Sequence, residues 1–504
     1  MTLARVRSGA LIGIEGIPLD VEVDIGSGLP AFNIVGLPDA AVQEARERVR
    51  AGVKNAGFEF PLRRITVNLA PADVRKEGPI YDLPIAVAVL LASAQVTGQF
   101  EDVALLGELS LDGHLRHANG VLPLVAMCRD AGIRAVIVPS EDVPEARLVG
   151  GIEVFGLETL TQLKDDPATW SGAPVGSVEE RAATPVHDLS VVQGQEHVKR
   201  ALEVATAGGH NIMLQGPPGA GKTLLARTMP GLLPPLTPGE ALEVTKVHSV
   251  AGMLGRGHPM VLERPFRAPH HTISHAGLVG GGSKIRPGEV SLAHRGVLFL
   301  DEFPEFGATA LEALREPLES GSVTISRARG SATFPARFLL VAAMNPCPCG
   351  YHGDARHPCT CAEAMVTRYQ RRISGPLLDR FDLFIDVPRV EYRELAGGPT
   401  GESSAAVRGR VAAAREVQRQ RLLGTPYLTT SEMGPLEVRE FCQQRLAPAA
   451  QPLLASAMER LALSARAFHR VLKVARTIAD LAGSETIEAA HLAEAIQYRR
   501  RTAD

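Results

Sequence analysis

Residues Gly216 to Thr223 form a glycine-rich run that can bind the phosphates of a nucleotide. They read Gly-Pro-Pro-Gly-Ala-Gly-Lys-Thr and match the phosphate-loop pattern G-x-x-x-x-G-K-[ST] in full. A strand-like run precedes them and helix-forming residues follow, so glycines can turn backbone N–H groups inward at the start of a helix. Lys222 is expected to reach the β- and γ-phosphates, and Thr223 to hold Mg²⁺. A chance glycine-rich loop is the plain alternative, but it would lack this context. The predicted nucleotide contacts are Gly216, Pro217, Pro218, Gly219, Ala220, Gly221, Lys222, Thr223 and Leu224.

Two carboxylates and an amide follow apolar strands further along the chain. Asp301 and Glu302 end the apolar run Val297–Leu300, and Asn345 ends the apolar run 338–344. At the carboxyl edge of a parallel sheet, such side chains would face the phosphate loop. We expect Asp301 to hold Mg²⁺ through water, Glu302 to polarise the attacking water, and Asn345 to orient it. A strand-ending Asn-Pro turn is the plain alternative for Asn345.

Two arginines could complete a site for phosphoryl transfer. Arg380 is a candidate arginine finger, because a planar guanidinium suits the charge that develops on the transferred phosphate. An ordinary ion pair with Asp379 or Asp382 is its alternative role. Arg466, at the start of a predicted helix, could contact the γ-phosphate from a helical lid. Two other arginines of that helix compete for this role: Arg470 and Arg476.

Four of the six cysteines lie within fifteen residues and form two C-x-C pairs: Cys347, Cys349, Cys359 and Cys361. Four thiolates can surround a tetrahedral Zn²⁺, and a chain of this length is not a small secreted disulfide framework. We therefore predict a structural zinc site within residues 347–361, between the strand of Asn345 and the segment of Arg380. The isolated Cys128 and Cys442 are expected to be core residues.

The composition indicates a globular protein of several domains. A chain of 504 residues is too long for one ordinary core, and 45% hydrophobic with 22% charged residues is typical of soluble proteins. The net charge of −3 excludes a protein that coats nucleic acid with its whole surface, so any such contact must be a local patch. The sequence contains neither an apolar run long enough to span a bilayer nor a cleavable signal peptide. We expect a cytoplasmic protein without membrane contact.

The elements that must position these residues follow a pattern along the chain. Residues 1–165 alternate strands with short helices, and residues 166–187 are rich in Pro, Gly, Ser and charge, as in a linker. Residues 188–390 alternate buried strands and helices around the phosphate loop, and residues 391–504 have helical periodicity. The sequence therefore predicts an α/β fold with a parallel sheet in residues 188–390 and a helical domain after it.

In combination, these motifs resemble AAA+ ATPases of the magnesium-chelatase-like group, and closely the ComM (YifB) family over nearly the whole chain. The resemblance is carried by Val192–Gln195, Lys199–Leu202, Ala207–Asn211, Gly216–Thr223, Arg267–Ser274, Gly296–Glu302, Met344–Pro346 and Ser374–Asp382. It implies an AAA+ P-loop core with a helical lid, ATP and Mg²⁺ as ligands, and a homo-hexameric ring with ATP at the subunit interfaces. It also implies that Arg380 acts on the ATP of a neighbouring subunit and that Arg466 is the lid sensor.

The same resemblance implies helicase activity and branch migration on single-stranded or branched DNA, in homologous recombination and natural transformation, with recombinase-associated proteins as further partners. Two segments exceed a minimal ATPase core: Pro259–His294, and Gly321–Phe334, which has the pattern of a β-hairpin with a basic tip. The resemblance implies that both point into the ring's pore, where six copies would concentrate modest charge. A solvated hairpin turn is the alternative. The candidate DNA contacts are Lys284, Arg286, Arg327 and Arg329.

The N-terminal residues resemble the proteolytic domain of Lon proteases, which has the fold of ribosomal protein S5 domain 2. Gly107–Leu115 and residues 131–139 carry this resemblance. Residues 76–83 occupy the position of the Lon serine motif without a serine, and residues 119–124 lack the lysine, so we expect no peptidase activity. A scaffold or a DNA-engaging role both stay open. For the whole chain, the alternative to a DNA motor is a chelatase-type ATPase that remodels a protein partner.

Overall fold

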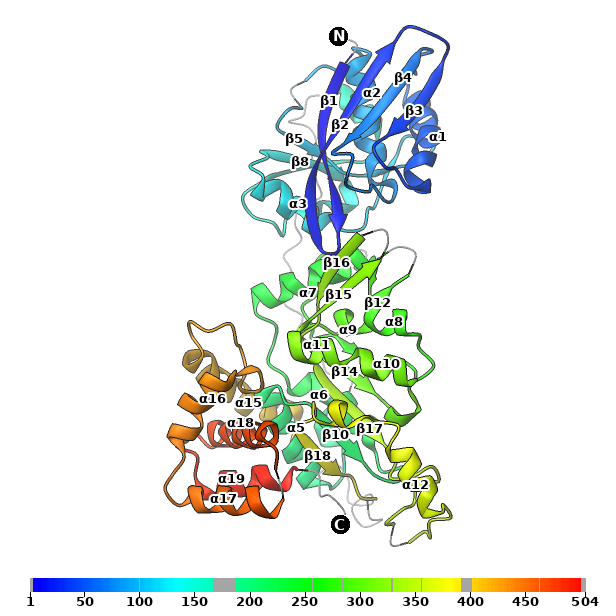
Figure 1. Ribbon diagram of the computed structural model, residues 1–504. Helices are drawn as coiled ribbons and strands as arrows, with labels where there is room; N and C mark the ends of the chain where they lie inside the picture. The colour runs from blue at the N-terminus through cyan, green and yellow to red at the C-terminus, as the bar shows by residue number, and fades with distance from the viewer. Residues whose placement is uncertain are drawn as a thin grey trace.

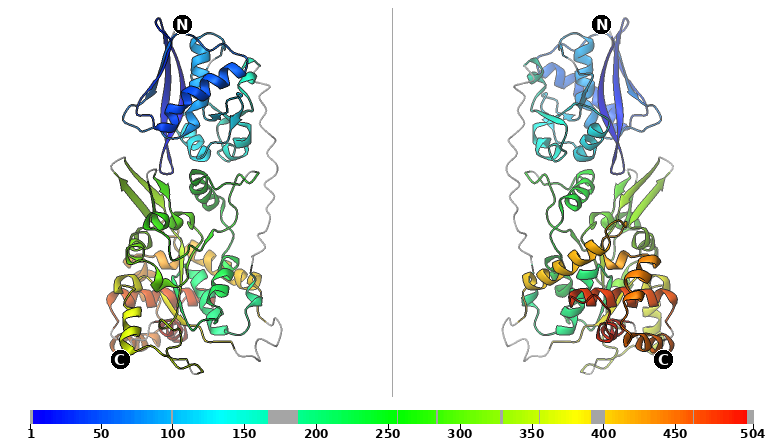
Figure 2. Two further views of the ribbon diagram at one scale, coloured as in Figure 1. Left: turned by 90° about the vertical axis from the view of Figure 1, so that its right-hand side faces the viewer. Right: turned by 90° about the vertical axis from the view of Figure 1, so that its left-hand side faces the viewer.

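The computed structural model places three regions one after another along the chain: an N-terminal mixed sheet, a central parallel sheet and a C-terminal group of helices (Figures 1 and 2). It describes residues 3–98, 100–165, 187–255, 257–282, 285–327, 330–354, 356–390, 401–461 and 463–499. Most of the predicted linker 166–187 therefore lies outside the described residues, as do Lys284 and Arg329 among the candidate DNA contacts.

The N-terminal region is built on a seven-stranded sheet. Its strands are, in spatial order, β3 (Ala31–Val35), β4 (Arg64–Ala70), β2 (Glu15–Gly26), β1 (Leu3–Ile12), β5 (Val103–Leu105), β8 (Ala135–Pro139) and β9 (Glu153–Leu157). The long β1–β2 hairpin is antiparallel, whereas β5, β8 and β9 run parallel. Alternate residues of β2 and β4 are buried, because one face of this sheet is covered by helices. These helices are α1 (Ala40–Asn55), α2 (Asp82–Ala92) and α3 (Val121–Asp130).

The central region is built on a five-stranded sheet in which all neighbouring strands are parallel. Its spatial order is β11 (Phe266–Arg267), β14 (Val297–Leu300), β17 (Leu339–Met344), β10 (Ile212–Gln215) and β18 (Leu383–Asp386). The strands β14 and β17 are buried along their whole length, which explains their unbroken apolar sequence. The structure thus confirms the predicted α/β fold with a parallel sheet. The longer helices of this region are α5 (Glu196–Gly208), α6 (Lys222–Leu232) and α7 (Pro238–Ala251).

A β-hairpin projects from the central region toward the N-terminal region (Figure 1). Its strands, β15 (Ser322–Arg327) and β16 (Gly330–Pro335), pair in antiparallel register directly after α11 (Arg315–Ser320), which confirms the hairpin expected from the sequence. A second, shorter hairpin pairs β12 (Gly280–Gly281) with β13 (Arg286–Pro287). The other short α-helices and strands of the described residues are α4 (Val143–Ala146), α8 (His275–Val279), α9 (Glu289–Leu292), α10 (Ala308–Ala313), α12 (Glu363–Gln370), α13 (Gly375–Leu378), β6 (Glu108–Leu109) and β7 (Leu115–Arg116).

The C-terminal region is helical, as the sequence predicts. Its helices are α15 (Ser404–Arg421), α16 (Pro435–Phe441), α17 (Ala450–Arg460), α18 (Ala465–Leu481) and α19 (Ala489–Gln497). Two of them begin after a serine whose hydroxyl accepts a backbone N–H group of the first turn, Ser403 before α15 and Ser464 before α18. The helices α15 and α18 both pack against α5 and so join this region to the parallel sheet. In the described part of the chain, no helix is both long and apolar enough to cross a membrane.

Within the described residues, the N-terminal region contacts the central region around two points. The turn of the β1–β2 hairpin lies against β16, where Ile14 packs onto the apolar cluster that contains the inner face of the β15–β16 hairpin. At the second place, the backbone N–H of Gly120 donates to the carbonyl of Ser249 at 3.2 Å. The Ser249 hydroxyl in turn donates to Glu145 at 2.6 Å. The N-terminal sheet therefore rests on α7 and on the projecting hairpin.

Candidate functional site

The phosphate loop joins β10 to α6 at the carboxyl edge of the parallel sheet. Gly219 and Gly221 have φ values of 77° and 85°, the left-handed region that favours glycine. Gly216 is required for a different reason, because a Cβ atom there would lie 2.2 Å from the carbonyl oxygen of Val387. The helix α6 begins at Lys222. Its N-terminal N–H groups therefore point into the loop, which is the arrangement that binds a phosphate.

Lys222 and Asn345 meet inside this loop. The Lys222 ammonium donates to the carbonyls of Gly216 at 2.7 Å and Pro217 at 3.0 Å, and to Oδ1 of Asn345 at 3.1 Å. Asn345 reaches it because β17 lies between β14 and β10, so the end of β17 is next to the loop. Burial lowers the pKa of Lys222, and the nearby carboxylate of Asp301 opposes this shift. Asn345 thus lies where an orienting residue would have to lie.

Thr223 and Asp301 bring two oxygens together beside the loop. The Thr223 hydroxyl donates to Oδ2 of Asp301 at 2.7 Å, and the backbone N–H of Glu302 donates to Oδ1 of Asp301 at 2.9 Å. Hydroxyl and carboxylate oxygens are the hard donors that Mg²⁺ prefers, so these two residues fit the ion. The magnesium ion would supply charge neutralisation for the phosphates. Asp301 and Thr223 therefore lie where the sequence places a magnesium site.

Glu302 turns its side chain into solvent at the same edge. Its backbone is in the left-handed region, with φ of 51°, so the chain bends sharply after β14. The exposed carboxylate lies 3.0 Å from Nδ1 of His271, which comes from the segment between α7 and β14. A carboxylate can polarise a water molecule only if water can reach it. The exposed side chain of Glu302 meets this requirement of its predicted role.

Arg380 and Arg466 lie at the opposite edge of the sheet from their own phosphate loop. The carbonyl of Arg380 accepts from the side chain of Asn211, which precedes the amino end of β10, at 3.0 Å. The four residues of β10 separate this point from the loop, about 13 Å of strand. Arg466 lines the same cavity as Arg380, a space of about 700 Å³ between the central sheet and the C-terminal helices. The cavity is basic, with seven arginines and one lysine against four carboxylates.

The four clustered cysteines fit a tetrahedral metal site. Their sulfur atoms all lie within 4.8 Å of one another, and Cys347 is 3.3 Å from Cys349 and 3.7 Å from Cys359. Four sulfurs at the usual Zn–S bond length would be about 3.8 Å apart. Backbone N–H groups of Tyr351 and Thr360 lower the pKa of Cys349 to about 5, whereas burial and the neighbouring sulfurs raise the pKa of Cys359 and Cys361. Among the described residues, no other group of His, Cys, Asp or Glu side chains brings three ligand atoms this close.

The cysteine loop also touches the phosphate loop. Gly350 has a φ of 87°, and a Cβ atom at this position would lie 2.5 Å from Cδ of Pro218. The backbone N–H of His352 donates to the sulfur of Cys347 at 3.3 Å, which holds the turn that carries Gly350. A metal bound by the cysteines would therefore fix one wall of the nucleotide site.

Two of the candidate DNA contacts can be placed. Arg327, at the end of β15, and Arg286, in β13, are both exposed. A Cβ atom on Gly281 would lie 3.3 Å from the Arg327 guanidinium, and Gly281 pairs with Arg286 in the shorter hairpin. The two hairpins thus lie side by side and carry basic side chains into solvent.

Models of known protein families match three parts of the chain. Residues 188–395 match the model described as magnesium chelatase, subunit ChlI, residues 21–142 the model of subunit ChlI of Mg-chelatase, and residues 401–499 its C-terminal model. Competence protein ComM of Haemophilus influenzae is 44% identical over 510 residues, which cover 99% of this chain and 98% of the relative. The chain belongs to the ComM/YifB family of magnesium-chelatase-like AAA+ proteins.

Other members of the ComM/YifB family match over the same length. A protein of Escherichia coli named YifB is 44% identical over 507 residues, covering 99% of this chain and 97% of its own. An uncharacterised protein of Mycobacterium tuberculosis is 47% identical over 508 residues, covering 99% of each chain. The similarity to these relatives therefore extends over all three regions of the chain.

Three residues near the site carry no signal that sequence reasoning could use. His271 reaches Glu302, Gly350 touches the phosphate loop, and Glu319 pairs with Arg380. Each of these contacts joins segments that lie far apart in the chain. His271 belongs to a short run of histidines whose spacing does not indicate a contact with Glu302, whereas Glu319 and Gly350 stand in ordinary surroundings.

Proposed function

We propose that this protein forms a hexameric ring that hydrolyses ATP at its subunit interfaces and moves single-stranded or branched DNA through the ring. In this proposal it is a helicase that drives branch migration in homologous recombination and natural transformation. The name of one relative, competence protein ComM, supports the link to transformation. Membership of an AAA+ family supports the use of ATP and Mg²⁺.

The main support for the proposal is that the phosphate loop and the two arginines lie at opposite edges of the parallel sheet. Lys222, Thr223 and Asp301 are at the carboxyl edge of the sheet, and Arg380 and Arg466 are at the amino edge. Within one chain these arginines are too far from the phosphates to stabilise phosphoryl transfer. In a head-to-tail ring, the arginine edge of one subunit would face the phosphate loop of the next, so each site would be completed by two subunits.

The paired hairpins support DNA as the substrate. A ring places six copies of Arg286 and Arg327 around one axis, so modest charge on each subunit would add up along a phosphate backbone. The scarcity of aromatic residues, 4% of the chain, favours contacts with phosphates over stacking on bases.

ATP hydrolysis by the purified protein, with and without DNA, tests the proposal. Hydrolysis should be stimulated by DNA, and Lys222→Ala should abolish it. Glu302→Gln should keep ATP binding, lower kcat by about 10²- to 10⁴-fold and stabilise an ATP-bound ring, because it removes the base but not the phosphate contacts. Glu305→Gln is the matched control, since Glu305 is close in sequence and pairs with Arg372 at 2.6 Å. Strand displacement on forked, duplex and Holliday-type DNA identifies the preferred substrate.

A chelatase-type ATPase that remodels a protein partner is the second candidate, and the descriptions of the matching family models favour it. The two candidates differ in their response to DNA. If the protein with ATP present has no affinity for DNA at low salt, the motor proposal is wrong and the remodelling function is preferred.

A further inference from the structure

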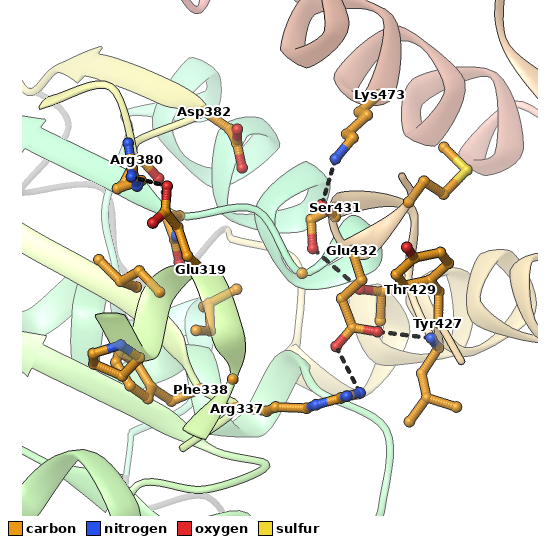
Figure 3. Close-up of a pocket in the computed structure, with 18 of the residues that line it drawn as sticks. Glu319, Arg337, Phe338, Arg380, Asp382, Tyr427, Thr429, Ser431, Glu432 and Lys473 are labelled. Carbon is orange, nitrogen blue, oxygen red and sulfur yellow. Dashed lines mark hydrogen bonds and ion pairs between the residues drawn. The ribbon is translucent and has the colours of Figure 1, made fainter. Parts of the chain in front are cut away.

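The side chain of Arg380 is held inside its own subunit by a carboxylate. Its guanidinium pairs with Glu319 and also donates to the carbonyl of Pro376 at 3.2 Å. Figure 3 shows Arg380 and Glu319 facing one another on one side of the cavity. Only 8% of Arg380 is exposed, whereas the Glu319 side chain is 58% exposed. A phosphate of a neighbouring subunit would therefore have to compete with Glu319 for the same guanidinium.

The backbone of Arg380 is fixed to the sheet and to the C-terminal helices. Asn211, at the amino end of β10, donates to the carbonyl of Arg380 at 3.0 Å. Arg470 of α18 donates to the next carbonyl, that of Phe381, at 3.2 Å. The Phe381 ring is fully buried and meets the ring of Phe303 edge to face, with centroids 5.6 Å apart. The backbone of Arg380 is therefore anchored to the parallel sheet and to α18.

Glu319, in contrast, is fixed to the base of the hairpin. Only Ser320 and Gly321 separate it from β15. The Ser320 hydroxyl donates to the carbonyl of Ser322 at 2.8 Å, and the carbonyl of Gly321 accepts the backbone N–H of Ala336, just after β16, at 2.8 Å. Both strands of the hairpin are thus tied to the end of α11. A displacement of the hairpin relative to the sheet would carry Glu319 with it.

We propose that Glu319 restrains Arg380 until DNA moves the β15–β16 hairpin. Displacement of the hairpin separates the Glu319 carboxylate from Arg380, and the freed guanidinium turns to the γ-phosphate bound by the neighbouring subunit. The contact between Glu319 and Arg380 therefore makes hydrolysis depend on DNA. This inference rests on the proposed function, because it needs both a ring and a DNA-contacting hairpin. Glu319 is a positioning residue that acts through Arg380.

The Glu319→Gln variant tests this restraint. This substitution removes the charge of the side chain but keeps its shape. ATP turnover without DNA should therefore rise about two- to fivefold, which is the change in rate that corresponds to the loss of one partly exposed ion pair. The KM for ATP should stay the same, and the stimulation by DNA should fall by the same factor. Glu319→Asp, which keeps the charge on a shorter side chain, should give an intermediate rise. The double variant Glu319→Gln/Arg380→Ala should be as inactive as Arg380→Ala.

Glu316→Gln is the matched control. Glu316 is an exposed residue one turn earlier in α11, and within the described residues it takes part in no ion pair. Equal basal rates for Glu319→Gln, Glu316→Gln and the unaltered protein would overturn the inference, provided that DNA stimulates the unaltered protein. A fall in kcat for Glu319→Gln at unchanged melting temperature would overturn it as well, because Glu319 would then assist Arg380. A lack of DNA stimulation in the unaltered protein would instead count against the proposed function.

Discussion

At the scale of single residues, an ion pair between a partly exposed histidine and a buried aspartate lies close to the contact between the N-terminal and central regions. Nδ1 of His117 lies 2.5 Å from Oδ1 of Asp142, whose side chain is almost fully buried. The hydrogen bond to Asp142 raises the pKa of His117 to about 9, and burial opposes this effect. Glu145 adds to the rise, and it also accepts the hydroxyl of Ser249 from α7. The charge of this histidine therefore contributes to the stability of the folded protein.

The stability of the protein should consequently fall in alkaline solution. Because the pKa of His117 is higher in the folded than in the unfolded chain, its contribution is complete below about pH 6.5 and is lost as the pH rises through about 9. After allowance for the exposed part of the ring, the loss is about 1 kcal/mol. Thermal unfolding between pH 6 and 10 measures it. His117→Asn should lack this part of the decline, and parallel curves for the two proteins would contradict the assignment.

At the scale of elements, the sequence predicts local patterns well and long-range contacts poorly. The strand before Gly216, the hairpin after Gly321 and the helices of the C-terminal region follow from periodicity and turn residues close together in the chain. The pair of Glu319 and Arg380 could not be predicted, because it depends on how α11 and α13 pack. The apolar run 104–109 has the pattern of one strand, but it is divided between two, β5 and β6. Between them, the backbone N–H groups of Leu106 and Gly107 donate to the carbonyls of Ile137 and Ile80.

The cysteine loop makes another long-range contact that the sequence does not predict. Four thiolates are recognisable in the sequence, but the contact of Gly350 with Pro218 is visible only in the fold. If zinc fixes this loop, its removal should loosen the wall of the phosphate loop and weaken nucleotide binding.

We therefore expect chelation, or Cys359→Ser, to lower the affinity for an ATP analogue several-fold while the secondary structure is retained. Isothermal titration measures the affinity, and metal analysis by mass spectrometry measures the zinc content. Chelated protein that is reloaded with zinc is the control and should recover full affinity. Unchanged affinity in metal-free protein would show that the cysteine loop does not support the nucleotide site.

At the scale of the whole molecule, the phosphate loop and the cavity that contains Arg380 and Arg466 lie at opposite edges of one sheet. In the proposed function they are the two half-sites of one ATP site. The hairpin between the sheet and the N-terminal region is contacted by Ile14 of that region and is tied through α11 to Glu319. The N-terminal region therefore limits how far the hairpin can move. A ring would join these half-sites and place all the hairpins around one axis.

Rings assembled from two different variants can show whether Arg380 acts on the ATP of the neighbouring subunit or on the ATP of its own subunit. Lys222→Ala subunits lack a working phosphate loop but keep Arg380, and Arg380→Ala subunits have the reverse defect. Each protein alone should be inactive. In an equal mixture, roughly a quarter of the interfaces would pair an intact loop with an intact arginine, so ATP hydrolysis should return to about a quarter of its normal rate. If Arg380 served its own subunit, no interface could be complete and the mixture would stay inactive.

The Arg466→Ala variant in place of Arg380→Ala should give the same recovery, because Arg466 shares the cavity at the amino edge.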